Sequence, residues 1–182
     1  MDHGASSYRR YLDGDEEAFD RIVTEYYEPL VSFVDGYVRD RSASEDIAMD
    51  VFADLIVFRH RYDPRWAFRT YLCMLGRSRA LNYIKRKGIL RFEPIQEAWE
   101  LADGENSPEE HLLRKERDGS VREALGALKQ DQREAVCLVY FQKLSCDDAA
   151  KVMRKSRKQV YNLLFRAKKN LRSVLGEKGA IL

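Results

Sequence analysis

The segment 144–175 carries the pattern that most restricts how this chain can fold. Ser145 is followed three residues later by Asp148, which is the spacing of a capping box that opens a helix. Residues 156–159 repeat the pattern with serine and glutamine. Beyond this second box, apolar side chains recur every three or four residues: Val160, Leu164, Ala167, Leu171 and Leu175. The segment therefore predicts two helices joined by a turn at residues 154–156, which is the arrangement of a DNA-binding helix-turn-helix.

Charge is distributed unevenly along the chain. The 182 residues have a net charge of +2, but residues 119–182 contain 14 basic and 6 acidic residues, which gives +8. Residues 89–118 contain 4 basic and 9 acidic residues, which gives −5. Residues 1–88 contain 14 basic and 15 acidic residues, which gives −1. Within the basic end, residues 151–172 hold nine basic residues and no acidic one. A solvated helix face usually mixes both signs, so this run favours a nucleic-acid partner.

Helical spacing of apolar residues recurs along the front of the chain. Pro29 is expected to divide the run 15–39 into two helices, because proline removes a backbone donor and clashes with the preceding turn. A capping box at residues 42–45 is expected to open the next helix, which should run to about Arg61. An aspartate-proline turn then leads to a helix at residues 68–87.

The acidic segment 89–118 reads as a linker. Its first part has no helical periodicity and contains Pro94 and an aspartate-glycine pair. A capping box at residues 107–110 is expected to start a helix again. We therefore predict an all-α fold of two small helical domains, residues 1–88 and 119–182, joined by the acidic linker.

Cellular location and redox state are also constrained by the sequence. No apolar run approaches the roughly 20 residues needed to span a bilayer, and the polar start is unlike a signal peptide. We therefore expect a cytoplasmic protein. The cysteines form no C-x-x-C pair, and their odd number indicates free thiols: Cys73, Cys137 and Cys146. The histidines match no metal-ligand spacing: His3, His60 and His111.

The front half contains a row of acidic residues. Asp46, Asp50 and Asp54 are spaced by four residues and so share one face of a helix. Such a row fits a solvated face, a surface that docks another protein, or a metal site. The metal reading is the weakest, because carboxylates on one helix lack partners from a second element.

The next stretch, residues 64–92, contains eight basic residues and no acidic one. Aromatic residues are interleaved with them: Trp66, Phe68, Tyr71, Tyr83 and Phe92. Basic side chains follow a phosphate backbone, and aromatic faces stack on unpaired bases. Phe68 and Tyr71 fit the core face of the helix, whereas Trp66 lies beside the turn and is the best candidate for an exposed aromatic residue.

Taken in order, these features resemble the extracytoplasmic-function (ECF) sigma factors of bacterial RNA polymerase. The front matches the opening of the family, its polymerase-binding helix and its promoter-melting helix at residues 15–19, 26–30, 45–52 and 68–86. The back matches its helix-turn-helix domain at residues 132–134, 140–141, 144–145, 149–150 and 166–171. The resemblance covers residues 15–175, with the linker outside it.

The resemblance implies three groups of site residues. The core-binding set would dock on the beta-prime and beta subunits of core polymerase: Asp46, Met49, Asp50 and Asp54. The minus-ten set would recognise and open that promoter element: Trp66, Arg69, Arg77, Ser78, Arg79, Asn82, Lys85 and Arg86. The minus-thirty-five set would bind duplex DNA: Arg157, Lys158, Gln159, Tyr161, Asn162, Arg166, Lys168 and Lys169.

The same resemblance implies partners and excludes a catalytic role. The chemistry and its magnesium belong to the polymerase, so no catalytic residue, metal or cofactor is expected in this chain. Promoter DNA and core polymerase are the implied partners, and an anti-sigma factor is a common partner in the family. The sequence departs from the family pattern at five positions: Met49, Ser78, Asn82, Arg154 and Leu163. Arg154 stands where glycine is frequent and is expected to adopt an uncommon backbone conformation.

Three other functions remain open at this point. A sigma-like decoy would bind regulators and not promoters, but it would not need two acid-free basic stretches. A helix-turn-helix regulator that acts without core polymerase would not explain the basic and aromatic helix at the front. A nuclease that uses the acidic row would cleave DNA with magnesium as an isolated chain.

Overall fold

The chain folds as two groups of helices. The computed structural model describes residues 2–88 and 124–175, and no strand occurs within these ranges. The first group consists of α1 (His3–Leu12), α2 (Glu16–Val38), α3 (Arg41–Val57) and α4 (Phe68–Arg86). The second group contains α6 (Gln130–Val136), the π-helical turn η1 (Cys137–Phe141), α7 (Cys146–Met153) and α8 (Arg157–Leu175). The prediction of an all-α fold is confirmed. The linker and the helix start predicted at residues 107–110 lie outside the described residues.

Helix α2 is the centre of the first group, because it packs against α1, α3 and α4. Ile22, Tyr26, Leu30 and Val34 recur every four residues along α2, and all four are buried. Gly76 lets α4 approach closely, since a Cβ at this position would lie 2.9 Å from Cδ1 of Leu30. In the described ranges, no helix is both long and apolar enough to cross a membrane.

Pro29 lies inside α2 and does not divide it, so the prediction of two helices was wrong. Proline removes one backbone donor and costs roughly 3 kcal/mol in a helix interior. Tyr26, Leu30 and Val31 surround this point and are all buried against neighbouring helices. We attribute the continuity of α2 to this packing, because burial of a large apolar side chain is worth about 1.5–3 kcal/mol.

Helix α3 starts and ends before its predicted boundaries. Asp40 is the N-cap in place of Ser42, and its Oδ1 accepts a hydrogen bond from the Ala43 amide at 3.1 Å. The helix ends at Val57, four residues before Arg61. Aspartate and serine are equally good N-caps, so the sequence does not rank two candidates that lie two residues apart. The start of α4 was predicted correctly.

Helices α7 and α8 form the predicted helix-turn-helix. The Ser145 hydroxyl accepts a hydrogen bond from the Asp148 amide at 3.0 Å. At the second box, the Ser156 amide donates to Oε1 of Gln159 at 2.7 Å, and the Gln159 amide donates to the Ser156 hydroxyl at 3.2 Å. Arg154 has a φ of 54° in the turn. The Ser145 N-cap, the capping box at residues 156–159 and the left-handed conformation of Arg154 are thus confirmed.

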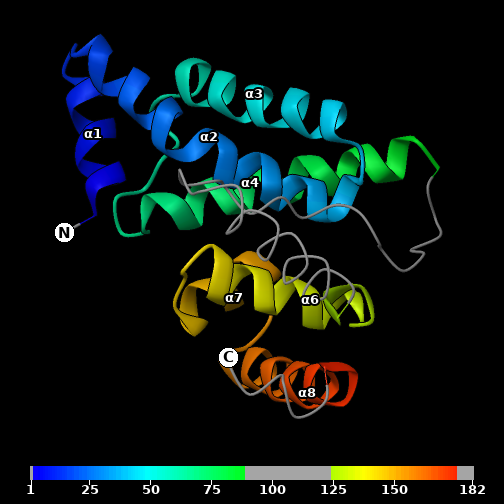
Figure 1. Ribbon diagram of the computed structural model, residues 1–182. Helices are drawn as coiled ribbons and strands as arrows, with labels where there is room; N and C mark the ends of the chain where they lie inside the picture. The colour runs from blue at the N-terminus through cyan, green and yellow to red at the C-terminus, as the bar shows by residue number, and fades with distance from the viewer. Residues whose placement is uncertain (1, 89–123, 176–182) are drawn as a thin grey trace, which may run out of the picture.

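The two groups share one hydrophobic core. The buried cluster that contains Val34 and Leu72 of the first group also contains Ala135, Leu138 and Ala149 of the second. In Figure 1 the second group lies below α2 and α4, with α8 outermost and α3 on the opposite side. A smaller cluster holds α8 on its own group: Ala124, Leu125, Leu128, Val136, Ala167 and Leu171. The two groups therefore pack as one body.

The π-helical turn η1 directs Gln142 into the junction between the two groups. The Gln142 amide donates to the carbonyl of Cys137, five residues earlier, at 2.9 Å. Its side-chain Nε2 donates to the carbonyl of Pro29 in α2 at 2.9 Å, and the residue is 4% exposed. Single π-helical turns are rare and frequently mark functional positions. Here the turn places a buried amide against the first group.

Candidate nucleic-acid interface

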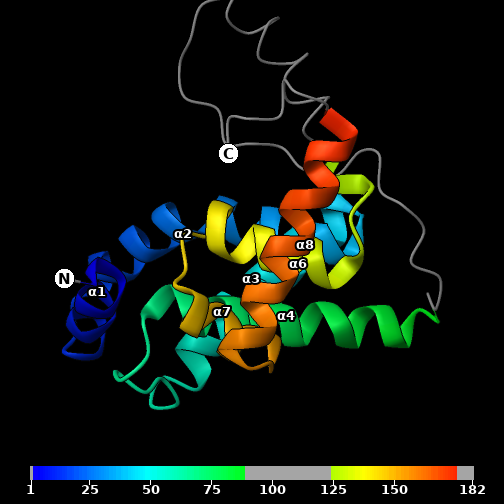
Figure 2. The same cartoon turned by 90° about the horizontal axis from the view of Figure 1, so that it is seen from below.

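Helix α8 exposes the whole minus-thirty-five set. Val160, Ala167 and Leu171 are buried on the opposite face. The exposed residues are Arg157, Lys158, Gln159, Tyr161, Asn162, Arg166, Lys168 and Lys169. Figure 2 shows α8 crossing the second group on the side turned toward the viewer. The structure therefore collects five basic and two amide side chains, together with Tyr161, on one accessible helix face.

Three members of this set have partners within the protein, since Arg157 lies over the ring of Tyr161 at 5.6 Å and both Gln159 and Arg157 make further contacts. Oε1 of Gln159 accepts the hydrogen bond from Ser156 that closes the capping box, so this atom is not available to a base while the box is closed. Nη1 of Arg157 lies 3.3 Å from Oδ2 of Asp147, and both side chains are more than half exposed. Exposed ion pairs of this kind are worth about 0–1 kcal/mol, so Arg157 is easily released to DNA.

The sequence analysis missed an exposed aromatic residue on the same helix. Phe165 is 74% exposed and lies four residues after Tyr161, which is 50% exposed. It shares its face with Asn162 and Lys169 through spacings of three and four residues. The signal in the sequence is that Phe165 falls outside the apolar repeat of the buried face.

The minus-ten set separates into two kinds of residue. Four residues are exposed along α4: Ser78, Asn82, Lys85 and Arg86. The other four are partly buried, and each contacts another side chain of the protein: Trp66, Arg69, Arg77 and Arg79. Half of the minus-ten set is therefore exposed on α4, and the other half contacts other side chains of the protein.

Arg77 joins the two groups of helices. Its Nε donates to Oε1 of Glu134 in α6 at 2.7 Å. The side chains are 19% and 4% exposed, so the ion pair is largely removed from water. Hydrogen bonding to Glu134 raises the pKa of Arg77, against the effect of burial. A carboxylate that is this deeply buried depends on its partner for stability.

Arg79 is held by the acidic row of α3. Its Nε and Nη2 lie 3.0 Å and 2.6 Å from Oδ2 of Asp54, and its Nη1 lies 2.9 Å from Oδ2 of Asp50. The core-binding set and the minus-ten set are therefore in direct contact at this point. The sequence analysis treated the two sets as separate surfaces, because nothing in the sequence pairs α3 with α4.

Trp66 is half-buried and contacts one lysine of the second group. Nζ of Lys151 in α7 lies 4.6 Å from the centre of the Trp66 ring, within the range of a cation–π interaction. Arg69 lies over the ring of Tyr26 at 4.9 Å. Trp66 is absent from both hydrophobic clusters of the described residues, so it is neither a core residue nor fully exposed.

The core-binding set forms the outer face of α3. Asp46, Met49 and Asp50 are exposed, and Asp54 is half-buried against Arg79. Met49 is 54% exposed, although it is a large apolar residue. Further apolar side chains are exposed at the end of the helix: Ile56, Val57 and Phe58. This mixture of acidic and apolar groups fits a protein-docking surface better than a solvated face.

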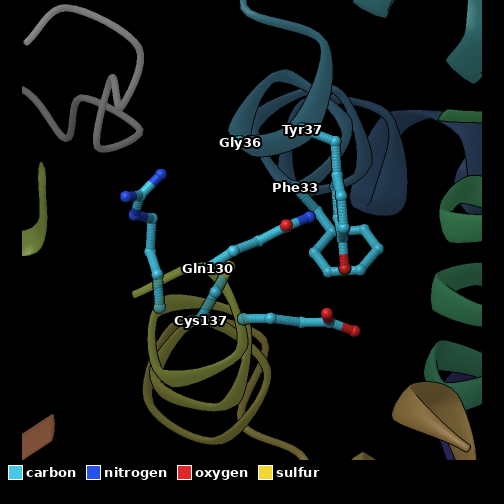
Figure 3. A pocket seen from close by; sticks show the side chains of 7 residues that line it. Phe33, Gly36, Tyr37, Gln130 and Cys137 are labelled. Carbon is cyan, nitrogen blue, oxygen red and sulfur yellow. The ribbon is translucent and has the colours of Figure 1, made fainter. Parts of the chain in front are cut away.

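A small pocket of about 20 Å³ lies between α2 and α6. Figure 3 shows Phe33 and Tyr37 of α2 facing Gln130 of α6 across it. Burial raises the pKa of the Tyr37 hydroxyl well above its usual value. Its volume is far below the roughly 300–1,000 Å³ of small-molecule sites. It belongs to the junction between the two groups and does not suggest a cofactor.

Comparisons with known proteins agree with this geometry. Residues 22–89 match the sigma-70 region 2 family, and residues 118–171 match the sigma-70 region 4 family. The chain is 28% identical to the RNA polymerase sigma-H factor of Pseudomonas aeruginosa over 176 residues, covering 91% of this chain and 90% of the relative. It is 26% identical to the ECF RNA polymerase sigma factor SigX of Bacillus subtilis over 164 residues, covering 86% of this chain and 83% of SigX.

Two solved structures share the fold. CnrH, solved in complex with the cytosolic domain of CnrY, has a TM-score of 0.68 and 21% identity, covering 96% of this chain and 97% of CnrH. RpoE of Bartonella quintana, solved with the anti-sigma factor NepR, also has a TM-score of 0.68. It is 17% identical to this chain, and the match covers 87% of this chain and 97% of RpoE. The helix-turn-helix with its exposed basic face, in a chain whose two parts match sigma-70 regions 2 and 4, places the chain among promoter-recognition proteins. The chain belongs to the RNA polymerase sigma factors, and within them to the ECF type.

Proposed function

We propose that this chain binds core RNA polymerase in the cytoplasm, recognises promoters and opens them, and that it contributes no catalytic residue. The observation that carries the proposal is the presence, in one chain, of two helices that contain basic but no acidic residues, α4 and α8, each with exposed basic side chains. A DNA-binding regulator needs one such surface, whereas a promoter-opening subunit needs one for duplex and one for unpaired DNA. The family membership of both halves supports the same function.

The proposed division of labour follows the surfaces. Residues 1–88 would form the domain that binds core polymerase and the minus-ten element, and residues 119–182 would bind the minus-thirty-five element. Residues 89–118 would link them. The acidic and apolar face of α3, with Asp46, Met49 and Asp50, would dock on the polymerase. For Arg77 and Trp66 to contact DNA, the second group must first release them, because Glu134 and Lys151 hold them here.

A regulatory partner is part of the proposal. Both structural relatives named above were solved in complexes, one with the anti-sigma factor NepR and one with CnrY. This supports an anti-sigma factor as a partner of the present chain.

Run-off transcription by core polymerase, with and without the chain, tests the proposed function on promoters from the same genome. We expect transcripts only when the chain is present. A helix-turn-helix regulator would bind DNA without supporting initiation, and a decoy would do neither. The absence of transcripts from every promoter to which the chain binds would therefore contradict the proposal.

The exposed face of α8 leads to a prediction about salt. If about five phosphates are contacted, the log of the affinity for a minus-thirty-five duplex should fall with log salt at a slope of about −4. Replacing Lys168 and Lys169 with alanine should make the slope less steep by about 2. It should also weaken binding to all DNA sequences alike, because these residues are exposed and basic. Lys129→Ala removes an exposed lysine outside α8 and is the control. A slope near zero for the unmodified chain would exclude this face as the DNA surface.

Trp66 leads to a prediction about promoter opening. Stacking of one base on an aromatic ring is worth roughly 1–3 kcal/mol. Trp66→Ala should therefore slow open-complex formation by about tenfold, while the affinity of the closed complex stays close to that of the unmodified chain. Stopped-flow fluorescence of a labelled promoter measures both quantities. Since Trp66 lies outside the hydrophobic clusters, we expect no loss of thermal stability comparable to that of a core substitution, and a large loss would contradict the assignment.

A further inference from the structure

The loop that joins α3 to α4, residues 58–67, is held by the N-terminal helix α1. This helix precedes residues 22–89, the part of the chain that matches the region 2 family. Figure 1 shows α1 beside the ends of α3 and α4 that the loop connects. The loop carries Trp66, so any contact that fixes the loop also determines where this aromatic ring lies.

Tyr8 of α1 fixes the start of the loop. Its hydroxyl lies 2.8 Å from the carbonyl of Leu55 and 3.0 Å from the carbonyl of Arg59. Leu55 belongs to the last turn of α3, where carbonyl groups lack partners inside the helix. Tyr8 is 1% exposed, and burial raises the pKa of its hydroxyl to about 12. The hydroxyl is therefore protonated at neutral pH and remains a hydrogen-bond donor.

Asp2 fixes the end of the loop. Its Oδ1 accepts a hydrogen bond from the Ala5 amide at 3.1 Å, and its Oδ2 accepts one from the Phe68 amide at 2.7 Å. One carboxylate thus caps both α1 and α4. Ala67, at the N-cap position of α4, provides no side-chain cap. Gly4 permits this close approach, since a Cβ there would lie 2.7 Å from Cδ1 of Phe68.

Tyr62 connects α1 to Trp66 through the middle of the loop. Its ring packs edge-on against Tyr8, with ring centres 5.5 Å apart, and against Phe68 at 5.4 Å. Its hydroxyl donates to the carbonyl of Trp66 at 2.7 Å. The position of Trp66 therefore follows from α1 through an unbroken series of contacts.

We propose that α1 is a positioning element for the 58–67 loop, and that Tyr8 and Asp2 hold Trp66 where it can stack on an unpaired promoter base. The inference rests on the proposed role of Trp66 in promoter opening. Ordering a free loop during binding costs affinity, and a loop that is ordered beforehand avoids this cost. Tyr8 and Asp2 act only through the loop and do not themselves contact DNA.

The variant Tyr8→Phe tests this inference, because it removes the hydroxyl and keeps the ring that packs on Tyr62. All variants carry Trp99→Phe, so that Trp66 is the single tryptophan of the two in the chain. Acrylamide quenching of the free chain reports the exposure of Trp66. The affinity of the complex with core polymerase for a single-stranded minus-ten oligonucleotide reports function. We expect quenching to increase and this affinity to fall about fivefold, the effect of one net hydrogen bond, with unchanged affinity for the minus-thirty-five duplex.

A matched control removes a buried hydroxyl at the other end of α3. The Ser44 hydroxyl donates to the carbonyl of Asp40 at 2.8 Å and lies 3.1 Å from Oδ1 of Asp35. Ser44→Ala should lower thermal stability about as much as Tyr8→Phe and leave both readouts unchanged. Tyr62→Phe loses only the bond to the Trp66 carbonyl and should reproduce the effect of Tyr8→Phe.

The two readouts separate failure of this inference from failure of the proposed function. Unchanged quenching in both tyrosine variants would overturn the positioning role of α1, whatever the role of Trp66 in DNA binding. Increased quenching with unchanged single-strand affinity would overturn the inference together with the role proposed for Trp66. Equal loss of core, duplex and single-strand binding would show general destabilisation and would also overturn it.

Discussion

The double variant Asp46→Lys, Asp50→Lys is expected to bind core polymerase about 100-fold more weakly or worse. Both carboxylates are exposed on the face of α3 that also presents Met49. Charge reversal at an interface places like charges together and costs several kcal/mol, and each 1.4 kcal/mol is a tenfold change in affinity. Competition with a labelled sigma factor for core polymerase measures this loss.

The controls for this variant must separate charge from contact. Glu17→Lys, Asp20→Lys changes the charge by the same amount on exposed positions of α2, and core affinity should be unchanged. Asp46→Lys alone is also needed, because Asp50 is a partner of Arg79 in the folded chain. That pair is largely exposed on the Asp50 side, so its loss should cost at most about 1 kcal/mol of stability. Core affinity equal to that of the unmodified chain in the folded double variant would remove α3 from the interface.

The second large effect is expected at the junction between the two groups of helices. Glu134→Gln should lower the free energy of unfolding by about 3 kcal/mol, because it leaves Arg77 without its charged partner at a largely buried position. Urea unfolding followed by circular dichroism measures this quantity. Since Arg77 retains some exposure, the effect should lie at the lower end of the range for buried pairs.

An exposed ion pair of similar length provides the comparison. Glu45 lies 2.8 Å from Arg41, and both side chains are about 40% exposed. Glu45→Gln should therefore cost no more than about 1 kcal/mol. The double variant Arg77→Met, Glu134→Leu should recover most of the stability, since apolar residues often replace a buried pair without loss. Equal effects of Glu134→Gln and Glu45→Gln would show that the Arg77 pair does not hold the groups together.

The relation between stability and function at this junction follows from the same contact. Arg77 and Trp66 belong to the minus-ten set, and both are held by residues of the second group. The contacts that stabilise the free chain are thus contacts that DNA must replace. In contrast, α8 is exposed over its whole predicted DNA face, so duplex binding does not require the two groups to separate.

Local sequence patterns were sufficient to predict the elements that depend on interactions between near neighbours in the chain. The helix-turn-helix follows from capping boxes whose partners are three residues apart, and from an apolar repeat that needs only helical geometry. The exposure of Asp46 and Asp50 and that of the basic face of α8 follow from helical repeats of this kind, because the apolar stripe dictates which side of a helix is buried. The continuity of α2 through Pro29 could not be predicted from the local sequence, since packing by distant helices outweighed the local cost of proline.

Which charged and aromatic residues meet depends on how the helices pack together. Glu134 is 57 residues from Arg77, and Asp54 is 25 residues from Arg79, so no sequence spacing announces either pair. Asp2 caps a helix that begins 66 residues later, and Tyr8 reaches a carbonyl 47 residues away. Contacts at such separations are created when helices pack on a shared core, and a helical repeat shows which face is buried but not which helix covers it.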